Sequence, residues 1–256
     1  MSDNNAFIFD THSHYDDEVF EGSLDTLVPE MEKAGVKKII TCGCDLKSSM
    51  KAIELAEKYN IIYAAVGIHP GNVDDDHQNI CEIEKLLNHE KCVAIGEIGL
   101  DYYWRQDNKE KQIEVFENLL NLANKHNLPV LVHDRDAHAD TLEILKEFKP
   151  KGVVHAFSGS VEMAREILKI GMYLGVGGVL TFKNARNLPA VVLDTEIEKL
   201  LLETDAPYLA PVPFRGKENH SDLIHFVAEK MAKIKGISKD EVLKTTFKNA
   251  ENLFKK

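Results

Sequence analysis

Residues 7–17 read FIFDTHSHYDD, and this stretch decides between the two folds that the rest of the chain allows. It begins as a short apolar run, typical of a buried strand, and continues at once into histidines and acids. An open, doubly wound sheet would place a glycine-rich phosphate loop after its first strand. The loop after this strand has no glycine and is rich in side chains that bind metals, which favours a closed barrel.

The same change from a short apolar run to a longer amphipathic segment recurs along the chain. Apolar runs predict strands at residues 7–10, 38–42, 62–66, 93–95, 129–132, 152–154, 173–176 and 200–202. Helical spacing of apolar residues predicts helices at residues 24–33, 48–58, 109–126, 141–147 and 161–169. Alternating strands and helices imply right-handed crossovers and a parallel sheet. Eight such units in 256 residues predict a (β/α)8 TIM barrel, with residues 1–256 as a single domain.

Two further helical stretches, at residues 223–233 and 238–254, predict an extra C-terminal helix. Ser238 and Glu241 have the spacing of a capping box, so we expect a helix to begin there.

The composition is that of an ordinary globular protein, with 44% hydrophobic and 29% charged residues. No apolar run approaches the roughly 18 residues of a membrane helix, and the first residues do not resemble a signal peptide. We therefore expect a cytoplasmic protein without a membrane segment; the sequence leaves the oligomeric state open. The net charge of -11 argues against a broad basic surface that coats nucleic acid, but not against a small site for one phosphodiester.

Four histidines follow predicted strands, at the end where a barrel gathers its functional residues. His12 and His14 are two positions apart, so their imidazoles face the same way from a strand. His133 and His155 end two successive strands, which are neighbours in a barrel. These side chains could therefore meet around a metal although they are far apart in the sequence.

Two acids complete this candidate metal site. Glu97 lies in IGEIGLD, where glycines on both sides admit other groups close to the backbone. Its two oxygens could join two metal ions. Asp205 ends the last strand, which lies beside the first in a closed barrel, and it could bind a metal or accept a proton from an activated water.

The chain also resembles the TatD family of metal-dependent deoxyribonucleases, within the amidohydrolase-like barrels. The resemblance is carried by FIFDTHSHYD, AVGIHPG, AIGEIGLDYY, PVLVHDRDA, GVVHAFSGS, LGVGGVLTFKNA, LLLETDAPYLAPVPFRGKEN and VAEKMAKIKGIS. These segments cover almost the whole chain. Two of them depart from the family's usual text. Asp134 stands where a serine is usual, and RGKENHSD at residues 215–222 is less basic than the usual RGKRNEP.

The resemblance implies a two-metal hydrolytic site that acts on DNA, trimming single strands from the 3′ end. It implies as metal ligands His12, His14, Glu97, His133, His155 and Asp205. Asp205 is the candidate general base, and Glu97 is the other candidate catalytic residue. Candidate substrate contacts are His69, Arg135, Arg215 and Lys217. Such ligands suit zinc, manganese or iron, and the family leaves magnesium possible.

Two other functions stay open from the sequence. A small-molecule amidohydrolase that cleaves an amide, ester or lactone would use the same activated water. A non-catalytic metal-binding protein is the alternative of another class. Structural metal sites usually have four ligands rich in cysteine, whereas this set mixes histidine with carboxylates, which favours an enzyme.

Overall fold

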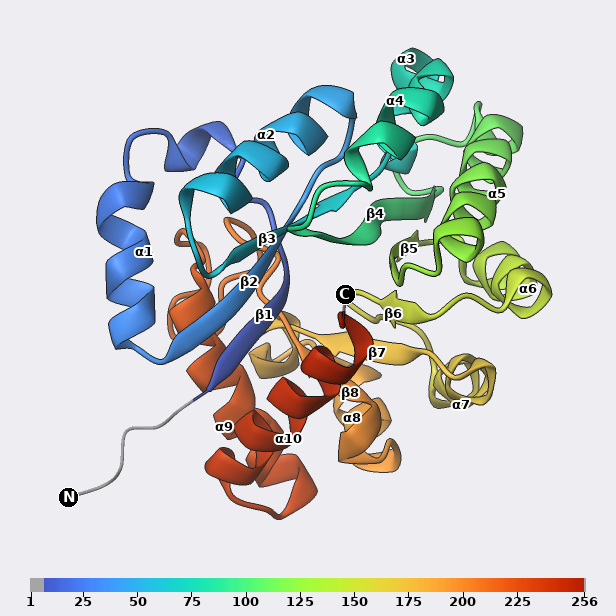
Figure 1. The fold of residues 1–256 in the computed structure, drawn as a ribbon. Helices are drawn as coiled ribbons and strands as arrows, with labels where there is room; N and C mark the ends of the chain where they lie inside the picture. Colours follow the sequence, from blue (N-terminus) through green and yellow to red (C-terminus); the bar gives the residue numbers. More distant parts are fainter. Residues whose placement is uncertain (1–6, 256) are drawn as a thin grey trace.

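The computed structural model describes residues 7–255, in which eight parallel strands surround a common centre (Figure 1). The strands are β1 (Ile8–Ser13), β2 (Val36–Cys42), β3 (Ile62–Val66), β4 (Cys92–Asp101), β5 (Val130–Arg135), β6 (Gly152–Val154), β7 (Tyr173–Val176) and β8 (Leu200–Leu202). Each strand pairs with the next one in the sequence, in the order β1 to β8. This confirms the predicted (β/α)8 barrel.

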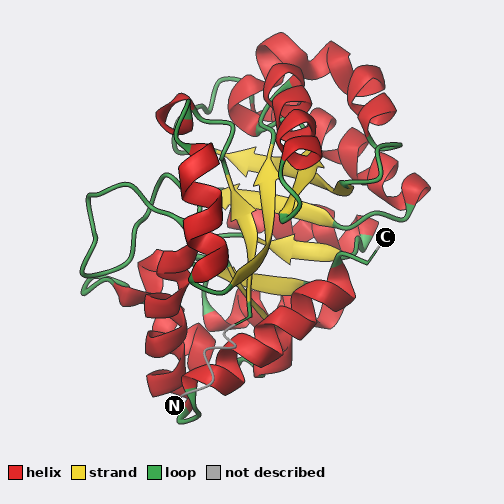
Figure 2. Cartoon of the chain, turned by 60° about the vertical axis from the view of Figure 1, so that its left-hand side comes forward, coloured by secondary structure: helices red, strands yellow, loops and turns green. Residues whose placement is uncertain are grey.

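Helices enclose the barrel (Figure 2). They are α1 (Leu24–Lys33), α2 (Leu46–Lys58), α3 (Val73–Asp76), α4 (Ile80–Leu86), α5 (Lys109–His126), α6 (His138–Phe148), α7 (Val161–Ile170), α8 (Leu188–Asp194), α9 (Ile224–Lys235) and α10 (Lys239–Leu253). The predicted bounds of α1 and α5 match residue for residue. The sequence patterns missed α3, α4 and α8, which have seven residues or fewer and too few turns for a clear apolar stripe.

The barrel closes where β1 meets β8. The Thr11 hydroxyl donates a hydrogen bond to the Leu202 carbonyl (3.1 Å), and the Asp205 amide donates to the His12 carbonyl (2.9 Å). A parallel bridge between Ser13 and Ala206 continues this contact beyond β8. The contacts that hold β8 and the segment after it to β1 therefore involve the same two segments that contain His12 and Asp205.

Several strands run further than their apolar runs predicted. β4 was expected to end at Ile95 but continues to Asp101, so Glu97 lies inside a strand. β4 also lies very close to β5 at Gly99, where φ is 144° and a Cβ atom would clash with the His133 carbonyl. A glycine is therefore required at this position, as the sequence of IGEIGLD predicted.

The last helix, α10, covers the amino-terminal end of the barrel. In Figure 1, α10 crosses in front of the strands and the C-terminus lies near their centre. The rings of Phe247 and Phe254 pack on Phe9 of β1, with centroids 6.0 and 5.9 Å away. Ser238 caps α10 by accepting a hydrogen bond from the Glu241 amide (3.1 Å), as its spacing predicted. Among residues 7–255, no helix combines the length and apolar character needed to cross a membrane.

Candidate metal centre and active site

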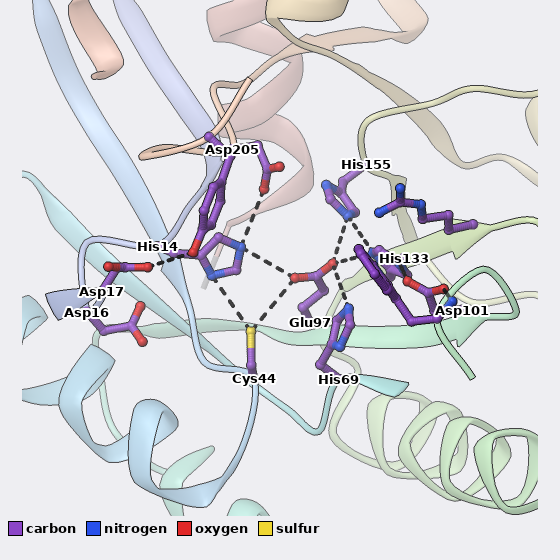
Figure 3. Close-up of a pocket in the computed structure, with 13 residues that line it drawn as sticks. His14, Asp16, Asp17, Cys44, His69, Glu97, Asp101, His133, His155 and Asp205 are labelled. Carbon is purple, nitrogen blue, oxygen red and sulfur yellow. Dashed lines mark hydrogen bonds and ion pairs between the residues drawn. The ribbon is translucent and has the colours of Figure 1, made fainter. Parts of the chain in front are cut away.

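A pocket of about 310 Å³ opens at the carboxyl ends of the strands. The side chains that line it include five of the six predicted metal ligands, namely His14, Glu97, His133, His155 and Asp205. The sixth, His12, is fully buried beneath them. Figure 3 shows histidines on both sides of the Glu97 carboxylate, as expected for residues from different strands that converge on one point.

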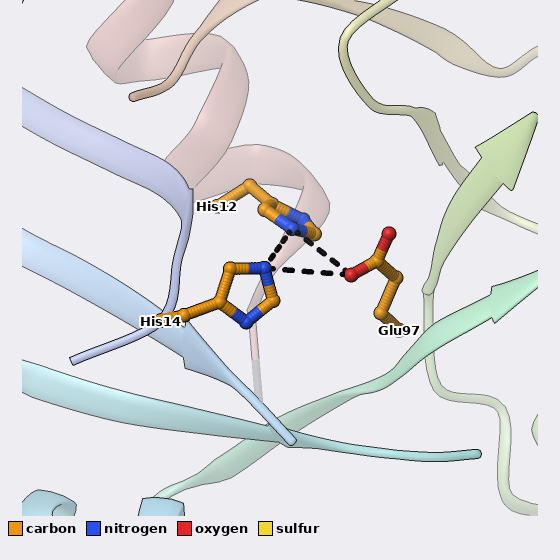
Figure 4. Close-up of side chains that lie close together, drawn as sticks. All are labelled: His12, His14 and Glu97. Atoms are coloured by element: carbon orange, nitrogen blue, oxygen red, sulfur yellow. Dashed lines mark hydrogen bonds and ion pairs between the residues drawn. The ribbon is translucent and has the colours of Figure 1, made fainter. Parts of the chain in front are cut away.

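One side of the site brings together His12, His14, Glu97 and Asp205. The Nε2 atoms of the two histidines are 3.2 Å apart, and each lies 3.5 Å from Glu97 Oε2 (Figure 4). Asp205 Oδ1 lies 3.6 Å from His12 Nε2 and 3.4 Å from His14 Nε2. Ligands about 2.1 Å from a tetrahedral metal ion are separated by about 3.4 Å. The spacing of the two imidazole nitrogens and the Glu97 oxygen therefore fits one divalent ion, and Asp205 lies close to both nitrogens.

The other side is built around the second oxygen of Glu97. Oε1 lies 2.7 Å from His133 Nδ1 and 2.8 Å from His155 Nε2, and these two nitrogens are 3.3 Å apart. His69 Nε2 is 3.8 Å from the same oxygen. Each oxygen of Glu97 thus faces its own set of imidazole nitrogens. A carboxylate in this position can bridge two ions.

Neighbouring groups fix which nitrogen faces the site in two of the imidazoles, those of His14 and His133. The Nδ1 atom of His14 lies 3.0 Å from the Cys42 carbonyl, which can only accept a hydrogen bond. In the neutral form of His14 the lone pair therefore resides on Nε2, which faces Glu97. In His133 it is Nε2 that faces a fixed acceptor, the Asp101 carboxylate at 3.1 Å, so Nδ1 is directed into the site. Such outer partners orient metal-binding histidines and raise their basicity.

The charges of the site are strongly coupled. Burial works against ionisation of Glu97, but the imidazoles of His155, His12 and His69 hold its pKa well below its usual value. Burial likewise opposes ionisation of Asp205, and His14 keeps the pKa of this acid low. Burial lowers the pKa of His12 to about 4. The carboxylates are therefore ionised and His12 is neutral. Burial opposes protonation of His14, His133 and His155, but their acidic neighbours raise the pKa of each, so a bound cation would have to displace protons from these imidazoles.

Comparison with known proteins agrees with this geometry. Residues 9–255 match the family model described as TatD related DNase. The chain belongs to the TatD family of metal-dependent hydrolases. It is 41% identical to the uncharacterized metal-dependent hydrolase YabD of Bacillus subtilis over 97% of this chain and 99% of the relative. It is similar in structure to YjjV, a TatD homologue of Escherichia coli, with a TM-score of 0.91, 32% identity and 98% of each chain covered. A TatD family hydrolase of Entamoeba histolytica has a TM-score of 0.88, 29% identity and coverage of 98% of this chain and 99% of its own.

The predicted substrate contacts lie in two different places. His69 and Arg135 line the pocket. Arg215 and Lys217 lie in the loop after β8 and line neither this pocket nor the adjoining one. The guanidinium of Arg215 packs over the ring of Phe182 at 4.4 Å. A phosphate contact by Arg215 or Lys217 therefore stays a prediction.

Sequence reasoning missed two acids that support the site. Asp101 lies four residues after Glu97 in β4, an even spacing that predicts the same face of a strand, and it contacts His133. Asp10 is fully buried and accepts hydrogen bonds from the Thr204 amide (3.0 Å), the Thr204 hydroxyl (2.7 Å) and the Ser221 hydroxyl (2.7 Å). Asp10 thereby fixes the segment that carries Asp205. Ser221, which departs from the family's usual text, takes part in this network.

Glu203, two residues before Asp205, lies behind the ligands. It is buried, and its Oε1 accepts a hydrogen bond from the Ala156 amide. A Cβ atom at Gly175 would clash with Glu203 Oε2, so the glycine leaves room for the observed position of this side chain. Burial raises the pKa of Glu203 to about 8. At neutral pH the group is therefore mainly a neutral acid next to the site.

Proposed function

We propose that this protein hydrolyses phosphodiester bonds at the ends of DNA strands, removing nucleotides from the 3′ end of single strands, with two divalent ions as cofactors. The observation that carries the proposal is the position of Glu97, whose two oxygens face two separate sets of histidine nitrogens. The DNA substrate and the polarity rest on membership of the TatD family.

The donor set fits this pair of ions. His12, His14 and Glu97 would hold one ion, with Asp205 3.4 Å from His14 Nε2. His69, Glu97 and His133 would hold the other, with His155 Nε2 2.8 Å from Glu97 Oε1. Nitrogen and carboxylate donors suit zinc, manganese or iron and suit magnesium less well. When bound, the ions would lower the pKa of a water molecule and stabilise the negative charge of the phosphoryl oxygens.

The protein side chains have distinct roles in this proposal. Asp205 Oδ1 is held 3.4 Å from His14 Nε2 and its pKa is low, so its free oxygen can accept the proton of the attacking water. Glu97 fixes the distance between the two halves of the site. Arg135 lines the pocket and can donate paired N–H groups to a phosphate. His69 lines the pocket 3.8 Å from Glu97 Oε1 and can contact the substrate.

The charge of the pocket limits how much phosphate can enter. Besides Glu97 and Asp205, it is lined by the carboxylates of Asp16, Asp17 and Asp101, against the single guanidinium of Arg135. Two divalent ions would bring this set close to neutrality. Such a pocket is suited to one or two phosphates at a strand end and not to a long stretch of backbone.

The same acids favour a second candidate, an amidohydrolase that acts on a small amide, ester or lactone. Asp16 and Asp17 could bind a cationic or neutral substrate as readily as they tolerate a phosphate. The two candidates differ in their response to salt, because phosphodiester binding weakens as salt rises while hydrolysis of a neutral substrate barely responds.

The test is a metal-reconstituted assay of the pure protein on 3′-labelled and 5′-labelled DNA, on RNA, and on amide and ester substrates. We expect loss of DNA cleavage on chelation, rescue by particular divalent ions, and a rate that falls as salt rises. Hydrolysis of amides or esters with no cleavage of DNA under any metal would replace the proposal with the second candidate.

A further inference from the structure

Two aromatic side chains stand exposed at the edge of the pocket, directly after β4. Tyr103 is 55% exposed and Trp104 is 69% exposed, and their rings meet edge to face with centroids 4.9 Å apart. Trp104 lines the pocket that contains the metal-ligand cluster. Tyr102, by contrast, is buried, and its hydroxyl donates to Asp140 (2.8 Å). The structure thus packs one aromatic residue of this turn and leaves the next two facing solvent.

Arg135 lies against this aromatic pair. Its guanidinium carbon is 4.0 Å from the ring centre of Tyr103 and 5.4 Å from that of Trp104. In the part of the chain that the structure describes, no carboxylate forms an ion pair with Arg135. Its neighbour Arg105 is different, because it is paired with Asp74 (3.0 Å) and Asp107 (2.8 Å). Arg135 is therefore positioned by stacking, and its N–H donors are left for a ligand.

A single carboxylate joins the aromatic pair to the metal-ligand cluster. Asp101 Oδ1 accepts hydrogen bonds from the amides of Tyr103 (2.9 Å) and Trp104 (3.1 Å), while Oδ2 lies 3.1 Å from His133 Nε2. The Asp101 amide donates a hydrogen bond to the side-chain oxygen of buried Gln112 (2.9 Å), which fixes the backbone at Asp101. The exposed rings are thus placed at a fixed distance from the reacting centre and do not belong to a free loop.

We propose that Tyr103, Trp104 and Arg135 form a binding site for one unpaired nucleobase and its adjoining phosphate. Trp104 stacks on the base, and Arg135 donates to the phosphate on the side that faces the metal-ligand cluster. Aromatic side chains bind single strands in this way because every base has a π-face, whereas a paired base is already stacked within its duplex. The inference deepens the proposed function, on which it rests: the substrate is a DNA end with at least one unpaired nucleotide beside the scissile bond.

The first experiment compares single-stranded DNA that carries a normal terminal base with the same strand made abasic at that position. For the wild-type protein we expect kcat/KM to be about 10-fold or more higher with the base present, in line with the contribution of one stacked base. Trp104→Ala should remove this preference and Trp104→Phe should keep most of it. Leu193→Ala is the matched control, because Leu193 is similarly exposed (64%) on α8 and lines neither this pocket nor the adjoining one.

The second experiment measures binding without turnover. Trp104 is the only tryptophan in the chain, so its fluorescence reports stacking directly. Metal-loaded Asp205→Asn protein should show quenching with base-bearing DNA, much less with abasic DNA, and less with blunt duplex. Quenching by an RNA strand of the same sequence would show whether the site recognises the base in both nucleic acids or in DNA alone.

The two experiments separate the possible failures. Equal kcat/KM on base-bearing and abasic strands, or a preference that survives Trp104→Ala, would overturn the inference and leave the nuclease proposal standing. If the wild-type protein cleaves no DNA, the nuclease proposal fails and the quenching experiment decides the inference alone. Absence of quenching by any strand would then end it as well.

Discussion

The two ends of the barrel are filled with opposite kinds of side chain. The amino-terminal end is apolar, with Phe9, Ile40, Leu131 and Leu201 packed beneath Phe254, which follows α10. The carboxyl-terminal end holds histidines and carboxylates at distances of 2.7 to 3.6 Å from one another. Buried charges without partners are costly, so the second arrangement needs a fold that is stabilised elsewhere. Apolar packing at the amino-terminal end therefore offsets the cost of the charged side chains that are buried at the carboxyl-terminal end.

Strand β1 contributes side chains to both ends of the barrel, and an irregularity in this strand directs them. Phe9 and His12 of β1 both face the barrel interior although they are three positions apart, which strict alternation of side chains would not allow. The pairing of β1 with β2 shifts register between Asp10 and Ser13. This irregularity turns His12 towards the site without changing the packing of Phe9.

The largest effect is expected at the polar end, from removal of the bridging carboxylate. Glu97→Ala should lower kcat/KM by about 1000-fold or more, because both halves of the candidate site lose a ligand. Bound metal, measured by elemental analysis, should fall together with activity while the far-ultraviolet circular dichroism is kept. His155→Ala should affect one of the two ions only. Full activity of Glu97→Ala would remove the two-ion proposal.

The matched change at the apolar end should alter stability and leave the chemistry intact. Phe254→Ala removes a buried ring from the base of the barrel and should lower the free energy of unfolding by about 3 kcal/mol. Denaturant unfolding gives this value. We expect kcat and KM to stay at wild-type levels well below the unfolding transition. A large loss of kcat in the folded variant would contradict the separation of the two ends.

A smaller effect should follow from the acid that orients His133. Asp101→Asn keeps the size of the side chain but weakens its hold on the imidazole, so metal affinity or kcat should fall by about 10- to 100-fold. Competition with a chelator measures the affinity. Gln112→Ala removes the acceptor of the hydrogen bond from the Asp101 amide. It should therefore lower metal affinity or kcat by a smaller factor. Unchanged metal affinity in Asp101→Asn would show that His133 does not need this partner.

The smallest effect concerns the rim of the polar end and depends on pH. The hydrogen bond to Asp134 (2.7 Å) raises the pKa of His138 above its usual value of 6.5. Because the folded-state pKa is raised, the stabilisation is complete below pH 6.5 and is lost as the pH rises through the raised value. The side chain is 41% exposed, so solvent screening limits the contribution to a few tenths of a kcal/mol.

His138→Gln should therefore lower Tm more at pH 5.5 than at pH 9. Asp134→Ser, which restores the residue usual in the family, should remove the same pH dependence. An equal change in Tm at pH 5.5 and at pH 9 would show that the His138–Asp134 ion pair does not contribute to stability.

Much of the barrel could be read from the sequence, because apolar runs of three to five residues alternate with amphipathic helices. The runs at 62–66, 152–154, 173–176 and 200–202 are the strands β3, β6, β7 and β8 without adjustment. β4 was underestimated because its continuation beyond Ile95 contains Glu97 and two glycines, which do not have the composition of a strand. Its conformation is imposed by pairing with β5 and not by local preference.

The candidate ligands could also be located, since residues at the ends of parallel strands must converge. The supporting groups were harder to find. Asp10 and Asp101 have no sequence signal beyond their spacing, because their partners, Ser221 and His133, are distant in the chain. The exposed pair Tyr103 and Trp104 was equally hidden, since nothing in GLDYYW tells which aromatic ring will be buried.

The most direct test of the central claim is a crystal structure of the metal-reconstituted protein with anomalous difference maps. The account predicts two peaks about 3.5 to 4 Å apart, one on each side of the Glu97 carboxylate, the first near His12 and His14 and the second near His133 and His155. A single ion, or two ions that Glu97 does not touch, would contradict it.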